Sequence, residues 1–445
     1  MIGYATPPIL YWRLSIVIRS KIGYLFLFLF LLPATFSCAV NLRELVYEES
    51  LPETLAEAGA RVVDTPSAGL IRIETLLFTP FTWQGIEWQN HLLIIRPPSV
   101  QSRVALIFIT GDYSYSEDEL AVFRLMALQN RAYVAVLFDV PNQPLFGGKR
   151  EDWLISHTFL EFLRTGDPRW PALVPMVEST VVSMNLIQDY ATSSGDSVEG
   201  FVLSGGSKRG WTTWLTAAID ERVEGIVPIA YDNLNLVDQM RHQIEFWGSF
   251  SRSIREYVDS GILNDFDDPN KRELLELVDP FTYRDSLDLP KLIVVGTNDP
   301  YWPVDAANLY IYDLPGYSGM VYAPNAGHGT EVYRVTQAIQ GMISHLNTGL
   351  ELPSIEIFLE ETASNVKVRF NVDERDSRLV ELRFFHSLST VRDFRKAFFE
   401  YKTIGKEEEI TVDKVSFNAF YIEGVFTFNG KELLISTPVK VIEAP

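Results

Sequence analysis

Residues 104–347 alternate between short apolar runs rich in β-branched side chains and longer segments with helical patterning. A strand that is apolar on both sides must be covered on both faces, and helices between successive strands provide that cover. The pattern therefore predicts an α/β fold with a mostly parallel sheet. We expect its strands at 104–110, 132–139, 199–204, 223–229, 291–295 and 319–323, and its helices at 117–129, about 150–165, 172–193, 211–219 and about 331–347.

Two further segments belong to this part of the chain. Residues 69–78 and 89–95 have the patterning of antiparallel strands that lead into the sheet. Residues 232–285 interrupt the alternation with helical, aromatic sequence between the fourth and fifth strands. An insertion at that point predicts a helical cap over an active site.

The sequence changes character after residue 350. Short runs that alternate apolar and polar residues follow Pro353, at 354–358, 365–370, 380–384, 414–417, 419–422 and 439–442. Period-two patterning with turns about every ten residues is typical of antiparallel sheets. We therefore expect an α/β domain over 45–350 and a small β-sandwich domain over 353–445.

The N-terminus has the pattern of a targeting segment. Residues 1–21 carry basic but no acidic side chains, residues 22–32 are apolar apart from a glycine and a tyrosine, and small residues follow up to Ala39. This predicts a signal peptide over 1–39 and an exported protein, periplasmic, secreted or held at the outer membrane. Because Cys38 stands where bacterial lipoproteins are acylated, attachment through a lipidated Cys38 is one alternative. A single membrane anchor is another, although the apolar run is shorter than the ~20 residues of a spanning helix.

The net charge and the cysteine content limit the binding partners and cofactors that we expect for this chain. The chain has 58 acidic and 38 basic residues and a formal net charge of −20. A chain this acidic should repel a phosphate backbone, so we expect no nucleic-acid partner. Cys38 is its one cysteine, which excludes an intrachain disulfide and a cysteine-based metal cluster. We expect no cofactor.

A glycine-rich turn stands between the third strand and the helix after it. The segment 201–211 reads FVLSGGSKRGW and places Ser207 between strand and helix. This context is typical of a nucleophile elbow, in which a strained turn exposes the serine hydroxyl at the sheet edge. The usual pattern is G-x-S-x-G, but here Arg209 occupies the second position after the serine and Gly210 the third. A simple glycine-rich turn is the alternative interpretation.

Two other chemically active residues follow strands. Asp299 comes just after 291–295, and His328 just after 319–323. Active sites of parallel sheets lie at the carboxyl ends of the strands, and the chain order serine, aspartate, histidine is that of α/β-hydrolases. We predict that His328 accepts the Ser207 proton and that Asp299 orients the imidazole. Asp232, after the fourth strand, is an alternative acid.

By analogy with other α/β-hydrolases, we also expect an oxyanion hole, which is a pair of N–H donors that stabilise the negative oxygen of the intermediate. One donor should be the backbone N–H of Lys208, and the other should come from the Gly111–Asp112 loop after the first long strand. The side chains of Lys208 and Arg209 have two interpretations. They could bind an acidic group of a substrate, or they could be paired within the protein.

These segments resemble the PhoPQ-activated pathogenicity-related proteins (PqaA-like). The resemblance rests on TWQGIEW at 82–88, FITG at 108–111, VPNQP at 140–144, GSKRGWTTW at 206–214, GTND at 296–299 and PNAGH at 324–328. It implies an exported serine hydrolase of the α/β-hydrolase fold, with the residues after 350 similar to the family's tail. In this chain Asp112 follows Gly111, where a second glycine or another small residue is expected.

The leading hypothesis is an exported serine hydrolase that cleaves an ester or amide of a small-molecule or peptide substrate through an acyl-enzyme. One alternative is a non-catalytic binding or signalling protein on a hydrolase scaffold. The other is a peptidase.

Overall fold

A single β-sheet forms the centre of the described part of the chain up to residue 350. The computed structural model describes residues 41–46, 52–65 and 69–443, and the predicted signal segment with Cys38 lies outside them. The sheet order is β1-β2-β3-β5-β4-β6-β7-β8-β9. Neighbours from β1 to β5 along this order are antiparallel and those from β5 to β9 are parallel. The strands are β1 (Thr54–Thr65), β2 (Gly69–Trp83), β3 (Ile86–Arg96), β4 (Val104–Ile109), β5 (Val134–Leu137), β6 (Gly200–Gly206), β7 (Val223–Ile229), β8 (Lys291–Gly296) and β9 (Ser318–Ala323).

This topology is that of the α/β-hydrolase fold, with an antiparallel entry and with β4 and β5 exchanged relative to their chain order. The predicted α/β fold with a mostly parallel sheet is confirmed. The sequence pattern did not predict β1, which forms a long hairpin with β2. Most residues of β1 are exposed, so the strand has no apolar face to produce the usual signal.

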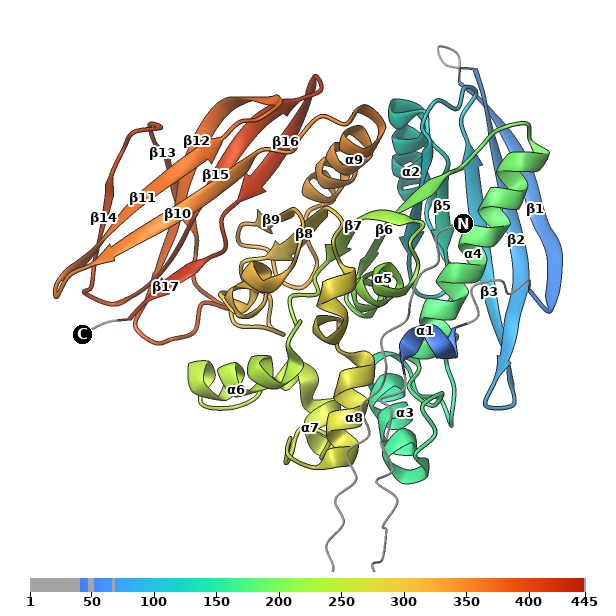
Figure 1. Ribbon diagram of the computed structural model, residues 1–445, viewed down its shortest axis with the longest axis horizontal. Helices are drawn as coiled ribbons and strands as arrows, with labels where there is room; N and C mark the ends of the chain where they lie inside the picture. The colour runs from blue at the N-terminus through green and yellow to red at the C-terminus, as the bar shows by residue number, and fades with distance from the viewer. Residues whose placement is uncertain (1–40, 47–51, 66–68, 444–445) are drawn as a thin grey trace, which may run out of the picture. The chain divides into compact units, whose positions relative to one another are not determined.

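Helices cover both faces of the parallel strands (Figure 1). Alternate residues of β4 point to opposite faces of the sheet and so belong to two different hydrophobic cores. Ala105 and Ile107 belong to the core with α4 (Leu173–Ser193) and α5 (Lys208–Ile219). Leu106 belongs to the core with α2 (Glu117–Asn130) and α9 (Val332–Thr348). Burial on both faces explains why the sequence of these strands is continuously apolar.

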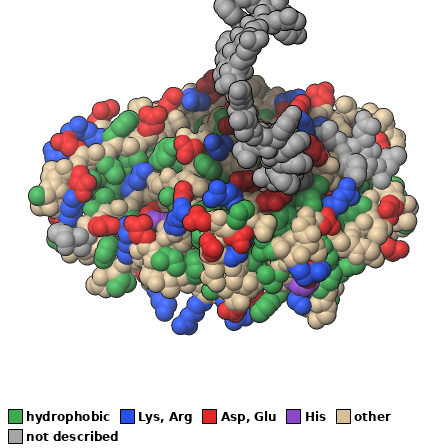
Figure 2. Space-filling view, turned by 60° about the horizontal axis from the view of Figure 1, so that its bottom comes forward, with side chains coloured by type: hydrophobic (Ala, Val, Ile, Leu, Met, Phe, Trp, Pro, Cys, Tyr) green, Lys and Arg blue, Asp and Glu red, His purple; other side chains and the backbone are tan. Residues whose placement is uncertain are grey.

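The cap is helical and is formed by two separate segments of the chain. α6 (Leu236–Trp247), α7 (Arg255–Asp259) and α8 (Pro269–Val278) come from the segment between β7 and β8. α3 (Glu151–Thr165), from the segment between β5 and β6, packs against α7 and α8. Figure 2 turns this end of the molecule forward and shows acidic, basic and apolar side chains interspersed over its surface. The remaining short helices are α1 (Leu42–Leu45) and 3₁₀ turns at Arg252–Ile254, Pro280–Ser286, Ala306–Leu309 and Ile311–Asp313.

After Thr348 the chain is all β. β10 (Ser354–Glu361), β11 (Asn365–Asp373) and β14 (Ile410–Asp413) form one antiparallel sheet. β12 (Ser377–Ser389), β13 (Glu400–Thr403), β15 (Phe417–Phe428), β16 (Lys431–Ser436) and β17 (Lys440–Ile442) form a second antiparallel layer. Val366 and Val368 of one sheet share a core with Phe384 and Phe420 of the other. The predicted strand at 419–422 is confirmed as part of the longer β15, whereas the one at 414–417 is wrong, because residues 414–416 form the bend before Phe417.

The second β layer also continues the central sheet. β16 pairs with β9 at Ser436 and Met320, which joins the two into one sheet path. The described residues accordingly cluster as a single compact unit. Among the described helices, none is long and apolar enough to cross a membrane.

Candidate active site

Ser207 occupies a strained turn between β6 and α5. Its backbone has φ +57° and ψ −123°, a conformation that costs free energy in a residue with a Cβ. A Cβ at Gly205 would stand 2.8 Å from the Arg209 carbonyl oxygen, and one at Gly210 would stand 3.0 Å from the Ile229 carbonyl oxygen. These contacts explain the glycines two residues before and three residues after the serine. The turn therefore has the geometry of a nucleophile elbow despite the unusual spacing.

The structure brings the three predicted residues into one hydrogen-bonded chain. The Ser207 Oγ lies 2.9 Å from His328 Nε2, and His328 Nδ1 lies 2.8 Å from Asp299 Oδ2. Asp299 is buried, and its other oxygen accepts a hydrogen bond of 2.9 Å from the Tyr301 backbone N–H. With Nδ1–H donating to the carboxylate, Nε2 carries the lone pair that can accept the serine proton. The Tyr301 ring stacks on the imidazole at 4.1 Å between centroids.

Asp232, the alternative acid, has a different hydrogen-bond partner. It is buried and accepts a hydrogen bond of 2.6 Å from the Tyr310 hydroxyl. Burial raises the pKa of Asp232 to about 7, against the opposing effect of that hydrogen bond. The described contacts of the His328 ring nitrogens run to Ser207 and Asp299, so Asp299 holds the acid position in this geometry.

Acidic residues at the start of α3 pair with the two basic residues after the serine. Lys208 Nζ lies 3.2 Å from both Glu151 Oε2 and Asp152 Oδ2. Arg209 donates two hydrogen bonds of 2.8 Å to Glu151. Burial alone would raise the pKa of Glu151, but the hydrogen bonds and charge of Arg209, together with the charge of Lys208, outweigh it and lower the pKa to about 2. Both basic side chains are therefore paired within the protein.

The predicted oxyanion donors lie as follows. Lys208 is the first residue of α5, so its backbone N–H has no partner within the helix and lies next to Ser207. Gly111 packs against Arg209: a Cβ there would stand 2.8 Å from the guanidinium. The Asp112 carboxylate is held by Arg150 and, at 3.1 Å, by Gln143. The donor roles of Lys208, Gly111 and Asp112 stay predictions.

Comparison with protein-family models finds a match to the PhoPQ-activated pathogenicity-related proteins over residues 56–395. The chain belongs to this family. It is also similar to the autocrine proliferation repressor protein A of Dictyostelium discoideum, at 31% identity over 273 residues. That match covers 57% of this chain and 55% of the relative, so it spans only about half of the relative's length.

Solved structures similar to this PhoPQ-related chain include two esterases. Acetyl xylan esterase 1 from Thermoanaerobacterium sp. JW/SL YS485 has 16% identity and a TM-score of 0.49, over 68% of this chain and 91% of the other. The acetyl xylan esterase from Paenibacillus sp. R4 has 15% identity and a TM-score of 0.46, with the same coverage of both chains.

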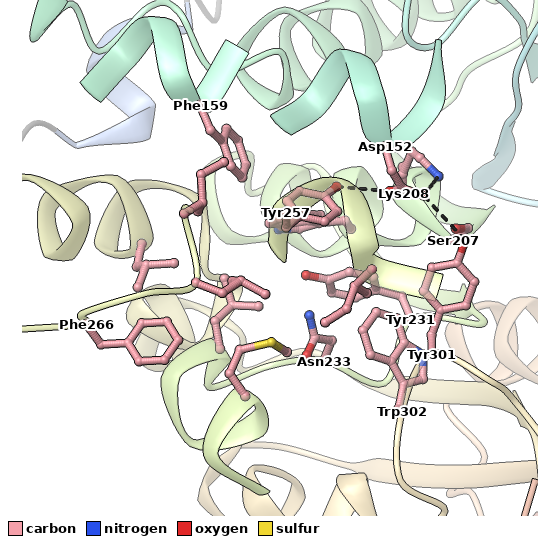
Figure 3. Close-up of a pocket in the computed structure, with 17 residues that line it drawn as sticks. Asp152, Phe159, Ser207, Lys208, Tyr231, Asn233, Tyr257, Phe266, Tyr301 and Trp302 are labelled. Carbon is pink, nitrogen blue, oxygen red and sulfur yellow. Dashed lines mark hydrogen bonds and ion pairs between the residues drawn. The ribbon is translucent and has the colours of Figure 1, made fainter. Parts of the chain in front are cut away.

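Two hollows meet at the serine of this family member. The first, which we name the cap cavity, spans about 670 Å³ of space between atoms, a volume that includes open solvent, and the centre of a water molecule has access to about 60 Å³ of it. In Figure 3 Ser207 lies at one end of it and Phe266 at the other. The second, which we name the α2–α9 groove, runs past Gly111, Ser207 and His328 between those two helices. Within the described residues, no group of three or more histidine, cysteine or acidic residues could hold a metal ion.

Residues that sequence reasoning missed surround the predicted ones. Glu151 and Asp152 carry no motif, and only their distance from Lys208 and Arg209 in space reveals their role. Asn298 and Asn325 belong to the segments that resemble the family, but nothing local indicates that they bind the backbone of residues 394–399.

Proposed function

We propose that this chain is a serine hydrolase that cleaves an ester or amide through an acyl-enzyme on Ser207. The observation that carries the proposal is the hydrogen-bonded chain from Ser207 through His328 to Asp299 at a strained elbow. A serine hydroxyl is a weak nucleophile, and an adjacent base whose far nitrogen is held by a buried carboxylate is what activates it.

The geometry supports the following steps. The Ser207 Oγ attacks the substrate carbonyl carbon while His328 Nε2 accepts the hydroxyl proton. Asp299 stabilises the imidazolium and keeps the ring oriented. The oxyanion of the tetrahedral intermediate is stabilised by the Lys208 backbone N–H at the start of α5, with a second donor from the Gly111–Asp112 loop. His328 then protonates the leaving group, and a water molecule that it activates hydrolyses the acyl-enzyme.

The first experiment is labelling with a fluorophosphonate, which phosphonylates an activated serine. Wild type should incorporate one label per chain and Ser207→Ala none. Ser197→Ala, at an exposed serine in the loop before β6, is the matched control and should label like wild type. An unlabelled wild type, or equal labelling of Ser207→Ala, would refute the proposal. Assays of p-nitrophenyl esters beside peptide p-nitroanilides separate esterase from peptidase activity.

Export is a separate part of the proposal. The basic, apolar and small-residue pattern of residues 1–39 supports it, with cleavage before Cys38 if that residue is acylated. Mass spectrometry of the protein from a membrane and a soluble fraction tests both points. A mature chain that still begins at Met1 would overturn export, and an unmodified Cys38 would overturn lipidation.

A further inference from the structure

The two hollows at Ser207 differ in which catalytic group they contain. Ser207 lines both of them. His328 lines the α2–α9 groove, whereas Lys208 lines the cap cavity. A substrate whose carbonyl carbon sits at Ser207 can therefore extend one part into each hollow.

The position of His328 determines which hollow holds the acyl part of the substrate and which holds its alcohol or amine part. The histidine that deprotonates the serine later gives its proton to the leaving group, so the leaving atom must lie beside His328. This places the alcohol or amine part of the substrate in the α2–α9 groove. The acyl part then extends to the other side of the carbonyl carbon, into the cap cavity.

The walls of the cap cavity are mostly apolar. Its aromatic residues are Phe159, Trp211, Tyr231, Tyr257, Phe266, Tyr301 and Trp302, and aliphatic side chains from α6, α8 and the segment between them complete it. Its charged groups are already paired: the Asp152 carboxylate lies 3.2 Å from Lys208 Nζ and accepts a hydrogen bond of 3.0 Å from the Tyr257 hydroxyl. A charged acyl group would lose its hydration there without gaining a free partner.

Polar atoms without a partner interrupt this apolar wall. Tyr231, Asn233 and Trp302 are 2%, 6% and 8% exposed. Within the described residues Asn233 Oδ1 and Trp302 Nε1 make no hydrogen bond, and the Tyr231 hydroxyl has the Asn233 side chain as its partner. In Figure 3 the Tyr231 hydroxyl and the Asn233 carboxamide lie beside each other on the wall of the cavity. Buried polar atoms nearly always have partners, so the two unpartnered atoms and the singly bonded Tyr231 hydroxyl leave hydrogen-bonding capacity along this wall for a ligand.

We propose that the cap cavity binds the acyl part of the substrate, an uncharged and mainly apolar or aromatic group that carries a hydroxyl or carbonyl for Tyr231 and Asn233. The inference rests on the proposed hydrolase activity and adds the class of acid that the enzyme releases. The phenol of Tyr231 can donate and accept, and the amide of Asn233 can do both as well. A hydroxyl on the acyl group can therefore bond to both residues at once.

The orientation is tested with two esters that exchange the bulky side. Methyl 3-phenylpropanoate has a large acyl group, and 3-phenylpropyl acetate has a large alcohol. Leu263→Trp narrows the cap cavity and should lower kcat/KM for the first ester at least 10-fold more than for the second. Val122→Trp, in the α2–α9 groove, should have the opposite selectivity. The reverse pattern in both variants would overturn the assignment.

The predicted hydrogen bonds from Tyr231 and Asn233, which we name the polar acyl site, are tested with two acyl groups that differ by one hydroxyl. We expect kcat/KM for methyl 3-(4-hydroxyphenyl)propanoate, or for its 3-hydroxyphenyl isomer, to exceed that for methyl 3-phenylpropanoate by about 10-fold or more, because a desolvated hydrogen bond discriminates strongly. Tyr231→Phe should reduce this ratio to near one. Tyr401→Phe, on exposed β13, is the matched control and should keep both the ratio and the rates.

The outcomes separate this inference from the proposed function. If wild type hydrolyses these esters with no preference for a hydroxyl, and Tyr231→Phe leaves the ratio unchanged, the polar acyl site is refuted while the hydrolase stands. If wild type neither labels with fluorophosphonate nor hydrolyses any ester, both are refuted. Calorimetric titration of Ser207→Ala with the two phenylpropanoates adds a readout without turnover, in which the hydroxylated ester should bind more tightly by a similar factor.

Discussion

Two asparagines in the loops of Asp299 and His328 are bound by the C-terminal β region. Asn298, directly before Asp299, donates from Nδ2 to the carbonyl oxygens of Phe394 at 2.9 Å and Ala397 at 2.7 Å. Asn325, three residues before His328, donates to the Phe399 carbonyl oxygen at 2.9 Å and accepts from its N–H at 2.7 Å. We predict that Asn298→Ala and Asn325→Ala lower both stability and activity.

The size of the effect follows from the bonds that are lost. Asn325→Ala removes two hydrogen bonds, and Asn298→Ala removes three, because Asn298 Oδ1 also accepts a hydrogen bond of 2.8 Å from the Thr297 hydroxyl. Each bond is worth about 1 kcal/mol, and the backbone groups left unpaired, such as the Ala397 carbonyl, add about 1 kcal/mol. The free energy of unfolding should therefore fall by about 3 kcal/mol in Asn325→Ala and by about 4 kcal/mol in Asn298→Ala. Because the asparagines hold the loops of Asp299 and His328, kcat should fall as well, by roughly 10-fold or more, since small displacements of catalytic groups are costly.

Urea unfolding and ester kinetics measure the two effects. Asn371→Ala, at an exposed position of β11, is the control and should stay within about 0.5 kcal/mol of wild type. Wild-type stability and kcat in both Asn298→Ala and Asn325→Ala would refute the reasoning. The same contacts affect a simpler experiment: truncation after residue 350 removes residues 394–399, so loss of function in the truncated chain would not show that the β region is the functional part.

Three other predictions concern the site. Asp299→Asn should lower kcat by up to about 10⁴-fold because the imidazole loses its orienting carboxylate, whereas Asp232→Asn should retain most activity; steady-state kinetics on the two variants would refute the assignment of the acid if the losses were reversed. The depressed pKa of Glu151 means that its ionised form stabilises the fold above about pH 4.5 and that this contribution is lost as pH falls towards about 2; Glu151→Gln should lose that pH dependence in acid-unfolding curves, and an unchanged curve would contradict the pairing. Gly205→Ala should give little folded protein because its Cβ would meet the Arg209 backbone at 2.8 Å; circular dichroism and soluble yield check this, and a folded, active Gly205→Ala would show that the elbow does not need the glycine.

The sequence was most informative where each proposed catalytic residue follows a buried strand. That Ser207, Asp299 and His328 lie close together could be predicted because the strand before each one is a continuous apolar run, and the ends of parallel strands meet at one edge. The local signal was weak at Ser207 itself, since Gly210 stands one residue later than usual. The structure shows why that position works: Gly210 packs against the end of β7, where a Cβ would stand 3.0 Å from the Ile229 carbonyl oxygen.

Residues whose partners are distant in sequence could not be predicted. Glu151 and Asp152 look like ordinary acidic residues at the start of a helix, where they would suit the helix dipole. Their pairing with Lys208 and Arg209 depends on how α3 docks beside the elbow, which no local pattern encodes. Strands β13, β14 and β16 were missed for a similar reason, because short strands form through their neighbours rather than through their own patterning.

The loop between β12 and β13 contacts both the loops of Asp299 and His328 and helix α6 of the cap. Besides binding Asn298 and Asn325, it places Arg395 over the Trp247 ring at 4.0 Å and Arg392 over the Phe246 ring at 5.0 Å, both on α6. The first two turns of α6 supply Leu236 and Met240 to the cap cavity. A change in this loop should therefore alter acyl selectivity together with kcat. The family match reaches residue 395, inside this loop, so the matched region extends beyond the α/β part into the segment that supports it. The β region is thus a structural component of the proposed active site rather than an appended module.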